Sequence, residues 1–148
     1  MMDRLFDSST IPLLAKVAAF AERRHEVLSG NVANISTPDY RTRDLPVAEF
    51  KAALAEAVAR RQTPTAGGPA AWSFAAGSDK GSIPELFPPQ LLQAVEGAPR
   101  TLTFQDGNNR SIEKEVMEMT KNSLMQSVAI ELMNAQLNRL QAVISERA

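Results

Sequence analysis

Hydrophobic side chains recur every three or four positions near the start of the chain, which is the spacing of an apolar stripe along a helix. Thr10 and Pro12 suit the first turn of such a helix. The helix must end before Pro38, because the residue before a proline is pushed towards an extended backbone. The stripe, apolar except for one histidine, consists of Ile11, Leu14, Ala18, Ala21, His25, Leu28, Val32 and Ile35.

The same spacing returns in the last third of the chain and continues almost to its end. No glycine or proline follows residue 107, so we expect one helix over residues 111–146, about 50 Å long from the rise of an α-helix. Ser123 and Gln126 lie in the middle of this stripe; they either fix the packing register, as polar residues do in coiled coils, or occupy a loosely packed site. The stripe consists of Ile112, Val116, Met119, Ser123, Gln126, Ile130, Met133, Leu137, Leu140 and Ile144, and a second apolar stripe beside it of Met117, Leu124, Val128 and Leu132.

The middle of the chain has a different character. Asp44 is a candidate cap for a second helix over residues 46–61, whose apolar face is Val47, Phe50, Leu54 and Val58. Six of the nine prolines and five of the seven glycines then lie between residues 62 and 100, so this stretch cannot hold a long helix. Alternation over residues 101–104 predicts one short strand.

These patterns predict a mainly α-helical fold with three parts that form one structural unit. Residues 1–61 are the N-terminal helical segment, residues 62–105 an irregular segment rich in proline and glycine with a short β element, and residues 106–148 the C-terminal heptad helix. The long N- and C-terminal helices are expected to pair as a coiled-coil-like bundle. Burying one apolar side chain contributes about 1.5–3 kcal/mol, whereas ordering each residue costs about 1–2 kcal/mol. We therefore expect the terminal helices to be weakly folded alone and stable in an assembly.

Composition argues against an enzyme and against most cofactors. The chain has no cysteine and a single histidine, His25, which excludes disulfides, thiolate catalysis and multi-histidine metal sites. A net charge of −1 gives no reason to expect a nucleic-acid partner. Apolar runs are too short for a membrane span, and the N-terminus lacks the order of a cleaved signal peptide. We interpret the charged groups Arg23–Arg24 and Glu113, Glu115 and Glu118 as solvated helix faces and helix-start charges.

One segment stands out, at the exit of the first helix. Asn31 and Asn34 lie on one helix face, where each side chain can bond to a neighbouring backbone group. Thr37–Pro38 forces an extended turn, and Tyr40 then offers an apolar ring with a polar tip. On the residues alone, an ordinary helix C-terminus explains this segment as well as a functional motif does.

The segment reads N-V-A-N-I-S-T-P-D-Y, and this pattern at the end of a first amphipathic helix resembles the signature of bacterial flagellar rod and hook proteins. The continuation over residues 40–45 and the Asp106-Gly107-Asn108 start of the last helical segment also fit. The short chain is most similar to the proximal rod subunits of that family. The resemblance covers residues 5–60 and 105–146. Asp39 stands where the family usually has glycine, so we expect a positive φ there.

The resemblance implies a structural subunit rather than an enzyme. Such subunits leave the cytoplasm through the flagellar type III export gate without a cleaved signal and polymerise into the periplasmic rod of the basal body, the tube that transmits torque and forms the export channel. The implied partners are further copies of the chain, other rod proteins, and the adaptor and export-gate proteins at the base. The expected assembly motif is Asn31, Ala33, Asn34, Thr37, Pro38 and Tyr40, and the expected helix-packing residues are Leu14, Leu28, Val32, Ile130, Met133, Leu137, Leu140 and Ile144.

Two other functions are compatible with parts of the sequence. One is a cytoplasmic helical adaptor or export chaperone that holds a partner helix in its groove. The other is a small enzyme that uses His25 with a carboxylate, which would need a folded monomer with a pocket. The heptads at both ends and the lack of a catalytic set favour assembly over both.

Overall fold

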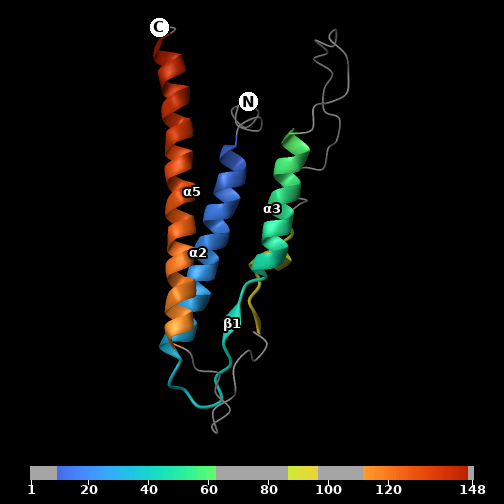
Figure 1. Cartoon of the computed structure of the whole chain (residues 1–148), viewed down its shortest axis with the longest axis vertical. Helices are drawn as coiled ribbons and strands as arrows, with labels where there is room; N and C mark the ends of the chain where they lie inside the picture. The colour runs from blue at the N-terminus through green and yellow to red at the C-terminus, as the bar shows by residue number, and fades with distance from the viewer. Residues whose placement is uncertain (1–9, 63–86, 97–111, 147–148) are drawn as a thin grey trace.

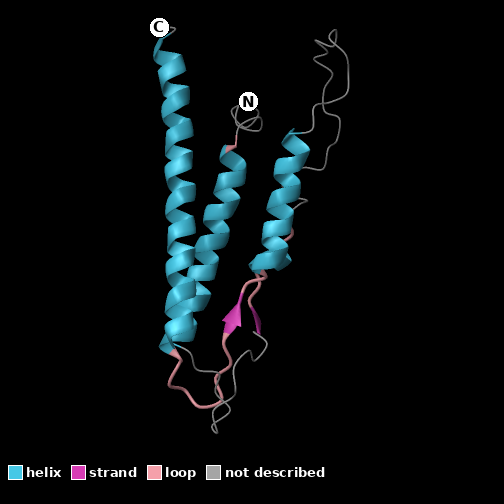
Figure 2. Ribbon diagram, in the orientation of Figure 1, coloured by secondary structure: helices cyan, strands magenta, loops and turns pink. Residues whose placement is uncertain are grey.

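The computed structural model describes residues 10–62, 87–96 and 112–146, and most of this part is helical (Figure 1). The long helices are α2 (Ile11–Ala33), α3 (Val47–Gln62) and α5 (Ile112–Glu146). A single 3-10 turn, η1 (Pro89–Leu92), and two short strands, β1 (Arg43–Asp44) and β2 (Val95–Glu96), complete the described elements (Figure 2). The strands pair antiparallel, with Arg43 opposite Glu96. The strand predicted over residues 101–104 lies outside the described residues.

Helices α2 and α5 run antiparallel and pack side by side, which confirms the predicted pairing of the terminal helices (Figure 1). Helix α2 has 23 residues and α5 has 35, so they are about 34 Å and 52 Å long. The extra length of α5 projects beyond the start of α2 (Figure 1). In the part of the chain that the structure describes, no helix is long and apolar enough to cross a membrane.

The buried face of α2 lies beside the predicted stripe. It consists of Leu13, Val17, Phe20, Ala21, Arg24, Leu28 and Asn31. His25, which the heptad reading placed on the stripe, is exposed. A shift of one residue rotates a helix face by about 100°, and the large ring of Phe20 gains more from burial than the small side chains of the predicted stripe.

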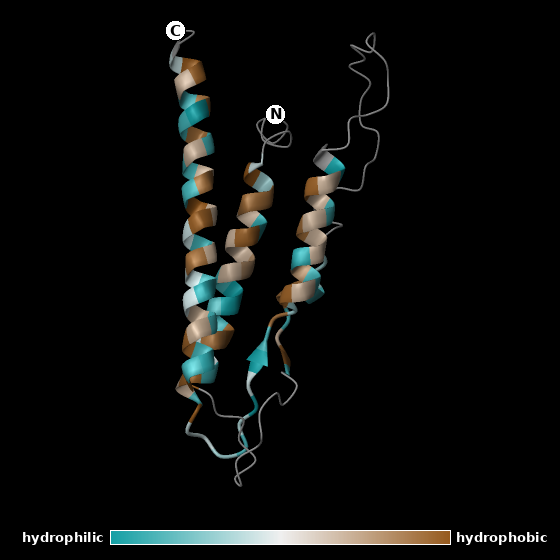
Figure 3. Cartoon of the chain, viewed as in Figure 1, coloured by the Kyte–Doolittle hydropathy of each residue, from teal (hydrophilic) through white to brown (hydrophobic). Residues whose placement is uncertain are grey.

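Helix α5 meets α2 with small, flexible and polar side chains. Asn122 and Ala129 are buried, and the half-buried residues beside them are Glu115, Glu118, Met119, Ser123, Met125, Gln126, Met133 and Gln136. Its large branched side chains face outwards, and Figure 3 shows apolar residues along much of the helix. The exposed members of the two predicted α5 stripes are Ile112, Val116, Met117, Leu124, Val128, Ile130, Leu132, Leu137, Leu140 and Ile144.

An aromatic cluster joins α2 to the first turn of α3. The rings of Phe20 and Phe50 stack with centroids 3.9 Å apart, and Phe87 lies tilted against Phe50 at 5.5 Å. Leu45 before α3 and Leu91 in η1 are buried in the same cluster. The predicted apolar face of the second helix is therefore used mainly at its N-terminal end.

We expect Phe50→Ala to destabilise the chain by about 3–4 kcal/mol, because it removes a buried ring with two aromatic neighbours. Chemical denaturation followed by circular dichroism measures the change. Val58→Ala is the control, since Val58 lies on the same helix and is 40% exposed. Equal stability of the two variants would contradict the assignment of Phe50 to the core.

Candidate functional site

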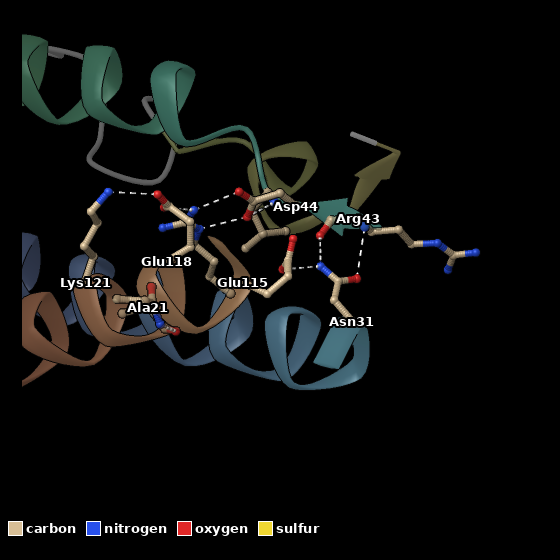
Figure 4. A network of polar contacts seen from close by, with 10 residues as sticks. Ala21, Asn31, Arg43, Asp44, Glu115, Glu118 and Lys121 are labelled. Carbon is tan, nitrogen blue, oxygen red and sulfur yellow. Dashed lines mark hydrogen bonds and ion pairs between the residues drawn. The ribbon is translucent and has the colours of Figure 1, made fainter. Parts of the chain in front are cut away.

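Asn31 is the centre of a buried polar cluster at the base of the helix pair. Its side chain is 1% exposed and uses both of its donors and both acceptor positions of its oxygen. Nδ2 donates to the carbonyl of Arg43 at 2.7 Å and to Oε2 of Glu115 at 3.0 Å. Oδ1 accepts from the Arg43 N–H at 3.0 Å and from the Tyr40 hydroxyl at 3.1 Å. One side chain thus joins α2, α5, β1 and the turn before β1 (Figure 4).

The choice of asparagine follows from the chemistry of its partners. A carboxamide carries the same donor and acceptor as a peptide group, so Asn31 pairs with the N–H and carbonyl of Arg43 as a neighbouring strand residue would. It thereby satisfies buried backbone groups that would otherwise cost about 1–3 kcal/mol each. Aspartate lacks the donors, and leucine lacks both kinds of group.

The turn between α2 and β1 is closed by local hydrogen bonds. Asn34 ends the helix: its backbone N–H and its side-chain Nδ2 both donate to the carbonyl of Gly30, at 3.1 Å and 2.9 Å. The N–H of Thr37 then donates to the carbonyl of Asn34 at 2.9 Å. Asp39 has a φ of 58°, which confirms the expected positive φ. The turn brings Tyr40 back against Asn31.

Arg24 holds the second part of the cluster together. Its Nε and Nη2 donate to the two carboxylate oxygens of Asp44, both at 2.8 Å, and Nη2 also donates to Oε2 of Glu118 at 2.9 Å. Lys121 donates to the other Glu118 oxygen at 3.0 Å. The Arg24 side chain is 7% exposed, so two carboxylates compensate its buried charge. We call Arg24, Asn31, Asp44, Glu115 and Glu118 the polar clamp.

Ionisation in the clamp follows from these contacts. The hydrogen bonds from Arg24 and then from Lys121 lower the pKa of Glu118 below its ordinary value of 4.5. The hydrogen bond to Asp44, opposed by desolvation and supported by Glu118, raises the pKa of Arg24 above its ordinary value. Both charges are therefore fixed at neutral pH.

Asn122 provides a third polar contact between α2 and α5. Its Nδ2 donates to the carbonyl of Ala21 at 2.7 Å, and the side chain is 1% exposed. Its Oδ1 is buried and has no hydrogen-bond partner among the residues that the structure describes. Exchange of the two amide atoms would place oxygen against oxygen at the Ala21 carbonyl, so the assignment stands.

The structure brings part of the predicted assembly motif together. Asn31 and Tyr40 are bonded to each other, and Asn34 and Thr37 shape the turn. Ala33 and Pro38 are exposed. Of the predicted helix-packing residues, Leu28 is buried, Leu14, Val32 and Met133 are half-buried, and Ile130, Leu137, Leu140 and Ile144 are exposed in the single chain. The packing role of the exposed residues stays a prediction.

Several interpretations of charged residues were wrong. Arg24 is not on a solvated face, and Glu115 and Glu118 are half-buried partners of α2 rather than only helix-start charges. Asp44 does not cap α3, which begins at Val47; it binds Arg24 instead. A seam placed one residue earlier would have aligned Arg24 with Val17 and Phe20 and revealed the buried position.

The members of the clamp bond to one another and to the backbone, so their chemistry is that of a structural joint. Within the described residues, no group of three or more His, Cys, Asp or Glu side chains is placed to hold a metal ion. What the arrangement can do is fix the direction in which the chain leaves α2 relative to α5.

We expect Asn31→Ala to lower the free energy of unfolding by about 2–4 kcal/mol, because it leaves the Arg43 backbone and Glu115 without a partner. Tyr40→Phe removes a single hydrogen bond and should cost about 1 kcal/mol. Denaturation curves of both variants against the wild type measure the difference. A larger loss from Tyr40→Phe than from Asn31→Ala would contradict the central position of Asn31.

The lowered pKa of Glu118 predicts a loss of stability in acid. A carboxyl whose pKa is depressed in the folded state stabilises fully above its unfolded value, and this contribution is lost as the pH falls through the folded value. The thermal midpoint should therefore fall as the pH is lowered below about 4.5, the ordinary value of this carboxyl. Glu118→Gln should be less stable at neutral pH and lose less on acidification, and Glu131→Gln, at an exposed position on α5, serves as the control.

Comparison of the sequence with known proteins shows the family to which the chain belongs. No protein-family model matches the chain. It is 34% identical to the flagellar basal body rod protein FlgB of Aeromonas hydrophila, over 80% of this chain and 79% of that protein. It is 30% identical to FlgB of Cereibacter sphaeroides over 88% and 89% of the two chains, and 29% identical to FlgB of Aquifex aeolicus over 93% and 94%. The chain therefore belongs to the FlgB family of flagellar basal body rod proteins.

Proposed function

We propose that the chain is a structural subunit of the proximal rod, and that it polymerises through α2 and α5 into the tube that transmits torque and forms the export channel. Its partners are further copies of itself, other rod proteins, and the adaptor and export-gate proteins at the base. It reaches the periplasmic rod by type III export without a cleaved signal, and it catalyses no reaction. Membership of the FlgB family supports a place in the rod, and the exposed apolar surface of α5 supports polymerisation.

The outer surface of α5 is the observation that carries this proposal. Large apolar side chains are exposed along the whole helix, from Val116 at 48% to Ile144 at 70%. Burial of each contributes about 1.5–3 kcal/mol, and α2 covers only one face of α5. Exposed apolar surface on this scale is typical of interaction sites. Contacts between unlike faces that do not close into a ring generate helical filaments.

The polar clamp has a clear part in such a subunit. It fixes β1, and through β1 the start of α3, against α2 by the contacts of Arg24 and Asn31, and Glu118 and Glu115 of α5 hold the same two side chains. Every copy would then present β1 and the start of α3 to its neighbours at the same angle. A repeating lattice requires this uniformity, because any angular error accumulates along a filament.

Mass spectrometry of purified basal bodies, with the cytoplasmic fraction alongside, tests the location. We expect the chain in the basal bodies. Its absence there, together with small cytoplasmic complexes, would instead support a helical adaptor or export chaperone that binds a partner helix.

A surface variant tests the assembly face. Leu124 is 66% exposed in the single chain, so Leu124→Gln should leave the helicity of the purified chain unchanged while reducing its recovery in basal bodies and the motility of the cells. Asn138→Gln introduces the same side chain at an exposed polar position on the same helix and is the control. Normal recovery of Leu124→Gln would contradict a role for this face.

A further inference from the structure

We propose that Asn122, together with the polar clamp, determines the register in which α5 pairs with α2, and that Asn122 is kept for this specificity at a cost in stability. The inference concerns the pairing of two helices within one chain. It goes beyond rod membership and does not depend on it.

The apolar side chains of α5 carry little information about register. The buried or half-buried apolar positions on its inner face are Met119, Met125, Ala129 and Met133. Methionine is flexible and fills gaps of many shapes, and alanine fits against almost any neighbour. A shift of α5 by one heptad in one direction would bring Gln136 to the place of Ala129 beside Val17 and Phe20, and Leu132 to the place of Met125. It would exchange one buried alanine for a glutamine and keep an apolar side chain at the second position, so the apolar contacts oppose the slip less than the polar ones do.

The polar contacts distinguish the observed register of the two helices from shifted registers more sharply than the apolar contacts do. Along α5, Glu115, Glu118 and Asn122 reach Asn31, Arg24 and the carbonyl of Ala21 in turn. The three α5 residues are spaced by three and four positions, as one helix face requires. Their partners on α2 differ in kind: a carboxamide, a guanidinium and a bare carbonyl. The order of the partners is therefore not repeated when the helices slide.

A slip by one heptad in either direction breaks these contacts. In one direction Met125 replaces Glu118 opposite Arg24, so the buried guanidinium keeps only Asp44. In the other direction Glu115 replaces Asn122 opposite the Ala21 carbonyl, which places a carboxylate against an acceptor in a buried position. Removing one partner of a buried charge is strongly unfavourable.

Asn122 itself shows the cost of this arrangement. Its Oδ1 is buried without a partner, and a buried unpaired acceptor is unfavourable. An apolar residue would avoid that penalty and pack as well. A single buried asparagine in a coiled coil similarly fixes register while lowering stability, and Asn122 occupies the equivalent position in the α2–α5 interface.

Disulfide trapping in the full-length chain tests the register directly, because the chain has no cysteine of its own. Val17→Cys with Ala129→Cys reports the observed register, since both residues lie in one buried cluster. Val17→Cys with Gln136→Cys reports a slip of one heptad. Oxidation is followed at a chain concentration where circular dichroism shows the helices formed. With Asn122 unchanged, the disulfide of the observed register should form at least about tenfold faster than the disulfide of the slipped register.

Asn122→Leu should reduce the ratio of these two disulfide-formation rates several-fold, while the thermal midpoint of unfolding stays equal or rises. Asn122→Ala adds no bulk and should also reduce the ratio, which covers a failure of the leucine variant to fold. Asn134→Leu makes the same change at an exposed position of α5 and should change neither quantity. An unchanged ratio in Asn122→Ala, or a fall in midpoint with the ratio preserved in Asn122→Leu, would overturn the proposal.

Discussion

The hydrogen-bonded carboxamide of Asn31 is the interaction on which the rest of this structure depends. It is buried at the point where α2, α5 and β1 meet, and each of its four contacts goes to a different group of the chain. Because its amide imitates a peptide group, the chain can leave a helix and run alongside it without unpaired backbone. The ion pairs of Arg24, about two turns earlier on α2, continue the same joint towards the aromatic cluster.

The helix pair is divided into two parts with different physical roles. At the clamp end, contacts are polar, directional and specific to one arrangement. Further along, Val17 and Phe20 pack in one cluster with Ala129 and Met125, so contacts there contribute burial without much geometric demand. Beyond the start of α2, the outward side chains of α5 have no partner on α2 at all. The α5 side chains that fix the arrangement within the chain and those proposed to bind neighbours therefore lie on different faces of one helix.

Much of the fold could be predicted from the sequence, because local rules set it. Thr10 and Pro12 placed the start of α2, and the heptad spacing the start of α5, within one or two residues; the start of α3 was predicted one residue early, with a cap at Asp44 that the structure does not show. The seam of α2 was displaced by one position, since small alanines and His25 fit a heptad as well as Phe20 and Arg24 do. Asn31 and Tyr40 were recognised through a motif. Their bonding, and the parts of Arg24, Glu118 and Asn122, depend on residues far apart in the chain, which no local pattern encodes.

The burial of Arg24 also makes its ion pairs less sensitive to ionic strength than the exposed ion pairs of the chain. Within the clamp, Arg24 and its neighbour Lys121 carry two positive charges against the two negative charges of Asp44 and Glu118, so the charges of these four ion-paired groups balance. Salt screens exposed charges over about 8–10 Å of solvent, and it weakens pairs such as Arg23–Glu26 and Arg60–Glu56, whose side chains are 44–59% exposed. The Arg24 side chain is shielded from that solvent. The angle between the helix pair and the rest of the subunit is therefore maintained across salt conditions that alter its surface.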